Sequence, residues 1–330
     1  MTAGPAAPGA MFHAGADDAA GGAEEGGGLP APMQLLPVER QRLADDGAPQ
    51  RLTAMEDSVA AEVPVALVFN GISQAVMMCT PQDLEDFALG FALSEGILDA
   101  AADCRDIAVR PVAPAGCAGP GAAPAPFDEE APAVEVHLEI SARSFARLKD
   151  RRRTLAGRTG CGVCGVDSLA ALDLAPERVA EPDWLAALDL RAVRRAFADF
   201  RRLQPLNARA GSLHAAGWAL PDGRLAAVLE DVGRHNALDK LLGRLAREGR
   251  LGGGAGLAAA PGFVVMSSRA SYELVRKCAR MGIPALATIS APTGLAVRIA
   301  EQAGMRLWGL CRGDAAVLYA PAGSFGAEGA

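Results

Sequence analysis

The sequence predicts an α/β protein that carries a smaller α+β part at its N-terminal end. Strand-like and helix-like segments alternate through the last third of the 330-residue chain, from Phe263 to Tyr319. Well before them, two short strand-like segments and one helix-like segment follow each other within residues 63–96. Strands and helices that alternate along a chain predict a parallel sheet covered by helices. A hairpin followed by a helix indicates a separate α+β unit.

Residues 1–50 are predicted to be disordered. The stretch is rich in Gly, Ala and Pro, as in residues 21–28, and few of its side chains are large and apolar. Burial of so little apolar surface does not offset the entropy lost when a chain becomes ordered. We therefore expect folded sequence from near Glu62, with the α+β unit within residues 51–150 and the α/β domain within residues 151–330.

The α+β unit opens with a predicted hairpin. Two runs rich in aliphatic residues, Val63–Phe69 and Ile72–Cys79, flank Asn70-Gly71, a pair typical of a tight turn with positive φ. Thr80-Pro81 then predicts a helix start with Thr80 as N-cap, because threonine caps helices and proline favours the first helical position. Gly96 predicts the end of this helix.

The α/β domain has a loop with the CxxC pair Cys161 and Cys164 at its start. A helix is predicted after it around Leu190–Leu203, and a hairpin around Pro221-Asp222-Gly223. Its later strands are Phe263–Met266, Ala285–Ile289, Arg306–Leu310 and Ala315–Tyr319. Helices between the first three imply a largely parallel sheet, in which ligands bind beyond the carboxyl ends of the strands. The residues predicted at those ends are Ser267, Ser268, Arg269, Ser290, Cys311 and Arg312.

Composition narrows the class of protein. Hydrophobic residues make up 50% of the chain and charged residues 22%, with a net charge of −7, which argues against general nucleic-acid binding. No apolar run reaches the roughly 18 residues of a membrane span, and the first residues lack the pattern of a secretory signal. Seven cysteines, an odd number spread unevenly, fit a reducing cytoplasm better than a disulfide framework.

Cys161 and Cys164 are the closest pair of cysteines, and Gly160, Gly162 and Gly165 surround them. Glycine reaches backbone conformations that other residues avoid, so we expect the pair on a loop or tight turn. A thiolate there can attack sulfur, bind a metal or carry transferable sulfur. A basic run leads into the loop, and it is either a solvated helix end or a group that lowers the pKa of the thiols. Its members are Lys149, Arg151, Arg152, Arg153 and Arg158.

Several interpretations of this pair stay open at this point. A structural zinc site usually needs a second Cys pair, which the chain lacks. A thioredoxin-like redox pair opens a helix after a strand, which the flanking glycine and basic residues fit poorly. A zinc deaminase needs a glutamate two residues after its histidine, whereas Ala216 stands two residues after His214. Sulfur carriage needs a thiolate on a flexible loop, and a buried pair without chemistry is the remaining alternative.

Motifs spread over residues 50–322 point to one family. They are Asn70-Gly71, Thr80-Pro81-Gln82-Asp83-Leu84, Gly90-Phe91, Ser94-Glu95-Gly96, Gly160-Cys161-Gly162-Val163-Cys164-Gly165, His214-Ala215-Ala216, Glu230-Asp231-Val232-Gly233-Arg234-His235-Asn236-Ala237-Leu238-Asp239-Lys240, Ser268-Arg269-Ala270-Ser271-Tyr272-Glu273 and Ser290-Ala291-Pro292-Thr293. With these motifs the chain resembles the formate dehydrogenase accessory sulfurtransferase family, FdhD. A CxxC pair alone is a weak signal, whereas the set is specific.

The resemblance implies a cytidine-deaminase-like α/β core, a smaller N-terminal α+β subdomain and a homodimer. It also implies that Cys161, with Cys164 beside it, accepts persulfide sulfur from a cysteine desulfurase. The sulfur then passes to the molybdenum, or tungsten, of the bis(molybdopterin guanine dinucleotide) cofactor of formate dehydrogenase. The cofactor-binding stretch maps to Leu310, Cys311, Arg312, Gly313, Asp314 and Ala315, and no metal ligands are predicted.

Two questions follow from the resemblance. The rival hypothesis is a binding chaperone that protects and delivers the cofactor without transferring sulfur. His214 and His235 have either a role in the site or a structural hydrogen bond, and Arg269 is placed at the same sheet edge by the strand pattern alone. A persulfide mapped to Cys161 would separate the carrier from the chaperone.

Overall fold

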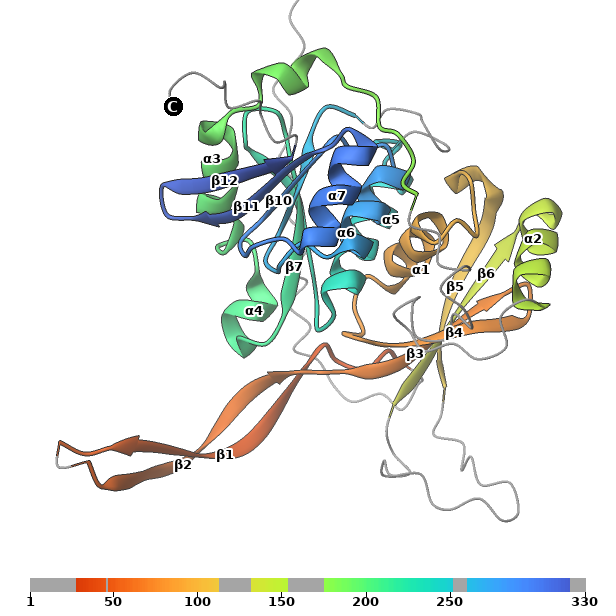
Figure 1. Ribbon diagram of the computed structural model, residues 1–330. Helices are drawn as coiled ribbons and strands as arrows, with labels where there is room; N and C mark the ends of the chain where they lie inside the picture. The colour runs from red at the N-terminus through yellow and green to blue at the C-terminus, as the bar shows by residue number, and fades with distance from the viewer. Residues whose placement is uncertain (1–27, 46, 113–131, 154–174, 252–259, 321–330) are drawn as a thin grey trace, which may run out of the picture.

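The computed structural model describes residues 28–45, 47–112, 132–153, 175–251 and 260–320. Their strands form a six-stranded sheet, a four-stranded sheet and a separate two-stranded hairpin. Figure 1 shows the six-stranded sheet with its helices beside the four-stranded sheet, and the hairpin projecting away from both. In the described part of the chain no helix is long and apolar enough to cross a membrane.

The six-stranded sheet has the order β12-β11-β10-β9-β7-β8. Its strands are β7 (His214–Ala219), β8 (Leu225–Asp231), β9 (Phe263–Met266), β10 (Ala285–Thr288), β11 (Arg306–Arg312) and β12 (Ala315–Ala320). Only β9, β10 and β11 pair in parallel, so the sheet is mixed and not largely parallel as the sequence predicted. The reason is that β7–β8 and β11–β12 are joined by tight turns, which make neighbouring strands antiparallel.

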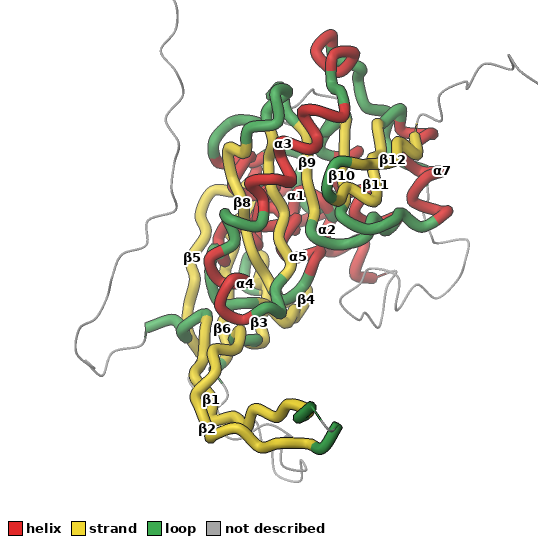
Figure 2. Tube along the Cα trace, turned by 90° about the vertical axis from the view of Figure 1, so that its left-hand side faces the viewer, coloured by secondary structure: helices red, strands yellow, loops and turns green. Residues whose placement is uncertain are grey.

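Helices cover both faces of this sheet, as Figure 1 and Figure 2 show. Val264 and Met266 of β9 point into the core cluster that contains helices α5 (Arg234–Arg247), α6 (Tyr272–Arg280) and α7 (Gly294–Ala303). Phe263 and Val265 point to the other face, where α3 (Leu190–Phe200) packs. Alternate residues of a strand face opposite sides, so a fully buried strand is apolar throughout. The fold class predicted from the sequence, an α/β core with a smaller α+β part, is confirmed.

The four-stranded sheet has the order β4-β3-β6-β5. Its elements are β3 (Val63–Phe69), β4 (Ile72–Cys79), α1 (Leu84–Ser94), β5 (Cys104–Val112), β6 (Ala133–Ile140) and α2 (Ala142–Arg153). The predicted hairpin is confirmed, with φ of 45° at Asn70 and 79° at Gly71. The remaining short helices are 3-10 helices η1 (Ala101–Asp103) and η3 (Asp183–Ala187), and α4 (Pro205–Ala210).

The prediction that Thr80 caps α1 is wrong. The helix begins after Asp83, whose φ is 53° and whose side chain makes no capping hydrogen bond. Thr80 is instead fully buried, and its hydroxyl accepts a hydrogen bond from the backbone N–H of Val232 at 3.2 Å. A tertiary contact with the other sheet therefore uses the side chain that the local pattern assigned to the helix end.

The two parts share one continuous hydrophobic core. Helix α1 of the small part packs directly on α5 of the large part, and both helices have a glycine at the crossing. A Cβ atom on Gly90 would lie 1.8 Å from the carbonyl oxygen of Asp239, and one on Gly243 would lie 1.8 Å from that of Asp86. The absence of both side chains lets the two backbones touch.

The prediction of disorder over residues 1–50 is wrong for its last part. Strand β1 (Met33–Leu43) pairs antiparallel with β2 (Pro49–Ala60), so ordered chain begins well before Glu62. The few apolar residues of β1 lie in a stretch whose average composition is dominated by Gly and Ala. Composition cannot show that a following segment supplies backbone hydrogen bonds, and that pairing orders the strand.

Candidate functional site

Polar residues from several of the motifs that carry the family resemblance lie together at one edge of the six-stranded sheet. Strands β8, β9, β10 and β11 all end at this edge, because β8 is antiparallel to β7, which is antiparallel to β9. Helices α5, α6 and α7 begin there. Three helix N-termini that share an edge create a positive local potential, which favours anions. The predicted position of Ser267, Ser268, Arg269, Ser290 and Arg312 at or just after the strand ends is confirmed.

Asp231 organises the connection between β8 and α5. Its Oδ2 accepts hydrogen bonds from the backbone N–H of Thr80 at 3.0 Å and from Lys240 Nζ at 2.8 Å. Its Oδ1 accepts from the N–H of Gly233 and from the Asn236 side chain, at 2.8 and 2.9 Å. Asp231 and Lys240 are completely buried. The carboxylate thus ties the small part, through Thr80, to the loop that opens α5.

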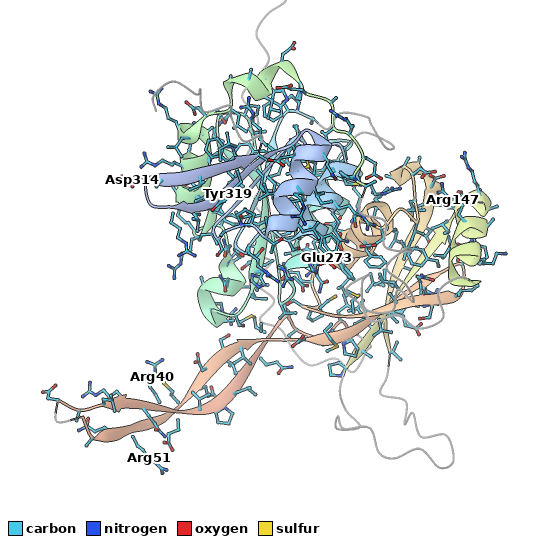
Figure 3. The ribbon with its side chains drawn as sticks, viewed as in Figure 1. Arg40, Arg51, Arg147, Glu273, Asp314 and Tyr319 are labelled. Atoms are coloured by element: carbon cyan, nitrogen blue, oxygen red, sulfur yellow. The ribbon has the colours of Figure 1, made fainter. Side chains whose placement is uncertain are left out.

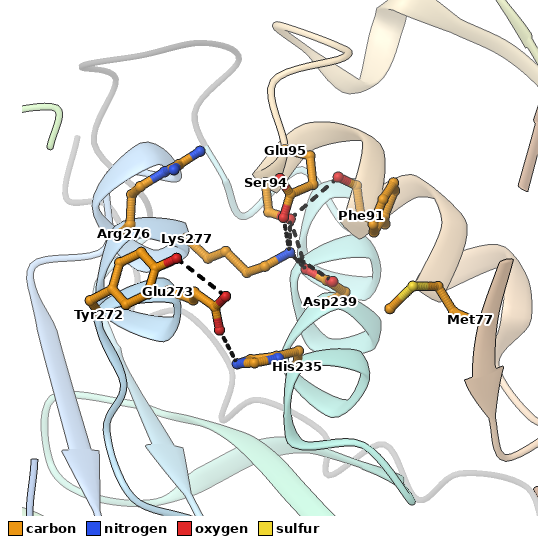
Figure 4. Close-up of a pocket in the computed structure, with 10 residues that line it drawn as sticks. All are labelled: Met77, Phe91, Ser94, Glu95, His235, Asp239, Tyr272, Glu273, Arg276 and Lys277. Carbon is orange, nitrogen blue, oxygen red and sulfur yellow. Dashed lines mark hydrogen bonds and ion pairs between the residues drawn. The ribbon is translucent and has the colours of Figure 1, made fainter. Parts of the chain in front are cut away.

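His235 forms an ion pair next to this loop. Its Nε2 lies 2.9 Å from a carboxylate oxygen of Glu273 at the start of α6, as Figure 4 shows. Burial raises the pKa of Glu273, but the hydrogen bond and charge of His235 outweigh it, and the pKa falls below its usual value. Burial, together with Arg234, lowers the pKa of His214. His235 therefore has a structural partner, and His214 is held towards its neutral form.

A cavity of about 60 Å³ lies between α1, α5 and α6 (Figure 4). Lys277 fills one side, and its Nζ contacts Asp239 at 2.9 Å, Glu95 at 2.9 Å and the Ser94 hydroxyl at 2.8 Å. Burial would lower the pKa of Lys277, but the two carboxylates together raise it above its usual value. This cluster is an ion-pair network that joins the three helices, and its polar groups are already engaged.

The predicted cofactor stretch forms the end of β11 and its turn into β12. Leu310 has a φ of 54° and an exposed side chain, where the pairing of β11 with β12 is irregular. Arg312 donates hydrogen bonds to the carbonyl of Ile289 at 2.9 Å and to the Ser290 hydroxyl at 3.3 Å. The stretch therefore lies against the end of β10. Gly313, Asp314 and Ala315 are exposed.

Cys311 differs from its neighbours, because its side chain points into the core on the α3 face. It is 4% exposed, and burial raises the pKa of its thiol to about 12. Within the predicted stretch, the polar groups that face outward belong to Arg312 and Asp314 and to the backbone of the turn.

Two further arginines lie at this edge without an acidic partner in the described residues. Arg234 opens α5, and its Nε is buried with no hydrogen-bond partner. Arg269 follows β9 and is exposed. The N-caps of α5 and α6, Gly233 and Ser271, make no side-chain capping hydrogen bond in the described part of the chain. Guanidinium groups and free helix N–H groups are the donors that phosphates prefer.

Arg234 was not singled out from the sequence, although it lies within a quoted motif. The same signal that selected Arg269 was present, because both residues stand between the end of a strand and the start of a helix. Cys161 and Cys164, the predicted sulfur-carrying pair, lie outside the described residues.

The four described cysteines are all free thiols with raised pKa values. Burial raises the pKa of Cys104 to about 11, those of Cys278 and Cys311 to about 12, and that of Cys79 well above its ordinary value. At pH 8 a thiol with pKa 12 has a thiolate fraction on the order of 10⁻⁴, against roughly a quarter for pKa 8.5.

We expect iodoacetamide at pH 8 to label Cys278 and Cys311 at least about 100-fold more slowly in the native protein than in urea, because both thiols are buried and protonated. Mass spectrometry of a time course gives the rate at each cysteine. Equal rates at these two positions in the native and the unfolded protein would contradict this assignment.

Comparison with known proteins identifies the family of this chain. The family model of the FdhD/NarQ family matches residues 60–325. The chain belongs to the FdhD/NarQ family. It is 51% identical over 284 residues to "Sulfur carrier protein FdhD" of Burkholderia cenocepacia, covering 86% of this chain and 92% of that protein. It is 54% identical over 263 residues to the protein of the same name from Chromobacterium violaceum, covering 80% and 88%.

A solved structure shows the same fold. The crystal structure of a Desulfotalea psychrophila protein, named for a formate dehydrogenase accessory role, superposes with a TM-score of 0.59. The superposition covers 86% of this chain and 96% of the other chain, and the two sequences are 21% identical. The FdhD/NarQ match begins at residue 60, which is the last residue of β2, so the rest of the β1–β2 hairpin lies before it.

Proposed function

We propose that this chain is a sulfur carrier that takes persulfide sulfur from a cysteine desulfurase and transfers it to the metal of bis(molybdopterin guanine dinucleotide) for formate dehydrogenase. Two observations support this proposal. The relatives of this chain in the FdhD/NarQ family are named sulfur carrier proteins. The chain also has the closely spaced cysteines Cys161 and Cys164, with glycines on both sides. The four described cysteines are protonated at neutral pH, so they are poor candidates for the same role.

The proposed chemistry is thiol–persulfide exchange. The Cys161 thiolate attacks the outer sulfur of the donor persulfide, a new S–S bond forms, and the donor cysteine leaves as a thiolate. For release, the Cys164 thiolate attacks Cys161 Sγ, and the outer sulfur departs with the bonding electron pair as sulfide towards the metal. The two thiols are thereby oxidised to a disulfide, and a cellular thiol reductant restores them.

The sheet edge described above is the proposed binding place of the sulfur acceptor. Its pyrophosphate groups need cationic and N–H donors. Arg234 begins α5, Arg269 precedes α6, and Arg312 lies against the end of β10 at the same edge. The buried Nε of Arg234 has no hydrogen-bond partner among the described residues, which fits a position that a ligand oxygen completes. His214 is held towards neutrality at the same edge and can donate or accept a hydrogen bond.

The proposed partners are a cysteine desulfurase as donor and formate dehydrogenase as the destination of the cofactor. We further propose that the protein forms a homodimer, as the family resemblance implies, and that it acts in the cytoplasm. The odd number of cysteines agrees with a reducing compartment.

The test of sulfur carriage is a mapping experiment. The protein is incubated with a cysteine desulfurase and ³⁵S-labelled cysteine, and the label is located after proteolysis without reductant. We expect the label on Cys161, its loss in Cys161→Ser, and its retention in the control Cys278→Ser. Intact acceptor binding with no label on Cys161 would instead support a chaperone.

Arg312→Gln is expected to weaken binding of guanosine diphosphate, which carries a pyrophosphate and the guanine base, about 10- to 100-fold. The reason is that one charge-assisted hydrogen bond contributes about 1.5–3 kcal/mol. Calorimetric titration measures the dissociation constant, and Arg298→Gln, an exposed arginine on α7, is the control. Unchanged affinity in Arg312→Gln would remove this residue from the proposed site.

A further inference from the structure

The last residues of β11 extend past the strand beside them. Pairing of β11 with β10 stops at Trp308, and its pairing with β12 is irregular between Gly309 and Arg312. Figure 3 shows Asp314 at the outer end of the projecting turn between β11 and β12, and Tyr319 nearer the body. The strand register therefore does not fix the predicted cofactor stretch, and other contacts hold it.

Residues 289–292, which we call the β10 loop, supply these contacts. The carbonyl of Ile289 accepts a hydrogen bond from Arg312 Nε at 2.9 Å. The carbonyl of Ser290 accepts one from the backbone N–H of Leu310 at 3.3 Å, at the residue whose φ is 54°. The end of β11 thus lies directly on the β10 loop.

The β10 loop also contacts the segment that follows β9. The backbone N–H of Ser290 donates to the carbonyl of Ser268 at 3.4 Å, and the next residue along the chain is the exposed Arg269. Only β10 separates β9 from β11, so the ends of these two strands lie about 10 Å apart. The β10 loop therefore sets the spacing between the segments that carry Arg269 and Arg312.

Thr288, the last residue of β10, fixes this loop from inside the protein. Its side chain is fully buried, and its hydroxyl donates to the carbonyl of Ser290 at 2.8 Å, with the carbonyl of Trp308 at 3.3 Å as a second, longer acceptor. A hydroxyl group has one proton, so the shorter contact is the principal hydrogen bond. The backbone of Thr288 also makes a hydrogen bond with the thiol of Cys311, within the cofactor stretch.

We propose that Thr288 is a positioning residue for diphosphate recognition at this edge. By holding the β10 loop, it keeps Arg269 and Arg312 at a spacing at which both guanidinium groups reach one diphosphate. Both arginines are exposed, so the backbone beneath them, and not packing of their side chains, decides where they stand. Binding groups lose affinity when their support lets them shift by about 1 Å. The inference rests on the binding place proposed above for the sulfur acceptor, and it adds a residue that touches no ligand.

Calorimetric titration of the full chain with guanosine diphosphate and with guanosine monophosphate tests this role. Thr288→Val keeps the shape of the side chain and removes its hydroxyl, whereas Thr288→Ser keeps the hydroxyl. We expect Thr288→Val to weaken diphosphate binding about 10-fold and monophosphate binding less than about 3-fold, because one phosphate does not span two arginines. Thr288→Ser should bind the diphosphate within about 3-fold of the wild type, since its hydroxyl can make the same hydrogen bond.

A second variant disturbs the β10 loop from its other side. A Cβ atom on Gly309 would lie 2.8 Å from the ring of Pro292, so Gly309→Ala pushes the loop away from β11. The same selective loss of diphosphate binding is expected, and it tests the proposal if Thr288→Val does not fold. Thermal unfolding of each variant shows whether it folds.

A purely structural role would lower both affinities by the same factor, because it would reduce only the folded fraction. Equal losses for the two nucleotides, unchanged diphosphate affinity in Thr288→Val, or an equal loss in Thr288→Ser would each overturn the proposal. A wild type that binds neither nucleotide would overturn the binding place and this inference together. The mapping of sulfur on Cys161 is a separate measurement. A label on Cys161 without the selective loss would overturn the role of Thr288 alone, and the selective loss without a label would overturn sulfur carriage alone.

Discussion

Lys240→Met is expected to lower the free energy of unfolding by about 3–5 kcal/mol. The Nζ of Lys240 lies 2.8 Å from Asp231 and donates to the carbonyls of Thr80 and Glu230, both at 3.1 Å, and no part of the side chain reaches solvent. Methionine matches the length of the side chain but provides no charge and no donor. The variant therefore leaves a buried carboxylate without its counter-ion, together with two carbonyls that lose a donor.

Urea unfolding followed by circular dichroism measures this loss. Lys149→Met is the matched control, because Lys149 is exposed and lies over the ring of Phe145. We expect it to change the free energy of unfolding by less than about 1 kcal/mol. A double variant with Asp231→Asn should cost less than the sum of the two single changes, since the pair acts as a unit. Additive costs would mean that Asp231 and Lys240 contribute independently.

The Asp231–Lys240 pair shows why the sequence predicts which residues lie at the sheet edge but not the buried contacts that hold them in place. The strand-end rule locates Ser290 and Arg312 because it depends on local periodicity, which the sequence shows directly. The contact of Thr80 with Asp231 joins residues 151 positions apart, and local patterns carry no information on such pairs. Thr80 therefore matches the local pattern of a helix cap, and no local pattern around Asp231 identifies its partner.

The elements of the fold also differ in whether the sequence predicts them, and for the same reason. The turn at Asn70-Gly71 is predicted correctly because its backbone conformation is set by the two residues themselves. Strand β5 was not predicted, since it lies at the edge of its sheet and most of its side chains are partly exposed. The β1–β2 hairpin was missed because the order of β1 depends on its pairing with β2, which local composition does not show. Interactions between segments, and not local propensity, decide these elements.

Gly90→Ala is expected to lower the free energy of unfolding by about 3 kcal/mol or more. The new methyl group would lie 1.8 Å from the carbonyl oxygen of Asp239, which belongs to the backbone of α5 and cannot rotate away. Overpacking of a tight core usually costs about 1–3 kcal/mol, and a clash between two helix backbones belongs at the upper end. Gly243→Ala, which meets the carbonyl oxygen of Asp86 at the same distance, should cost a similar amount.

Gly294→Ala is the matched control, because Gly294 opens α7 and a Cβ there meets nothing within 4 Å. Alanine favours helices over glycine, so this change should leave the free energy of unfolding unchanged or raise it by up to about 1 kcal/mol. If Gly90→Ala and Gly294→Ala had equal stability, the close crossing of α1 and α5 would be wrong. Because α1 carries Ser94 and Glu95 to Lys277, forced separation of the helices should also disrupt the ion-pair network between the two parts. A lower urea dependence of unfolding in Gly90→Ala would show that loss of cooperativity.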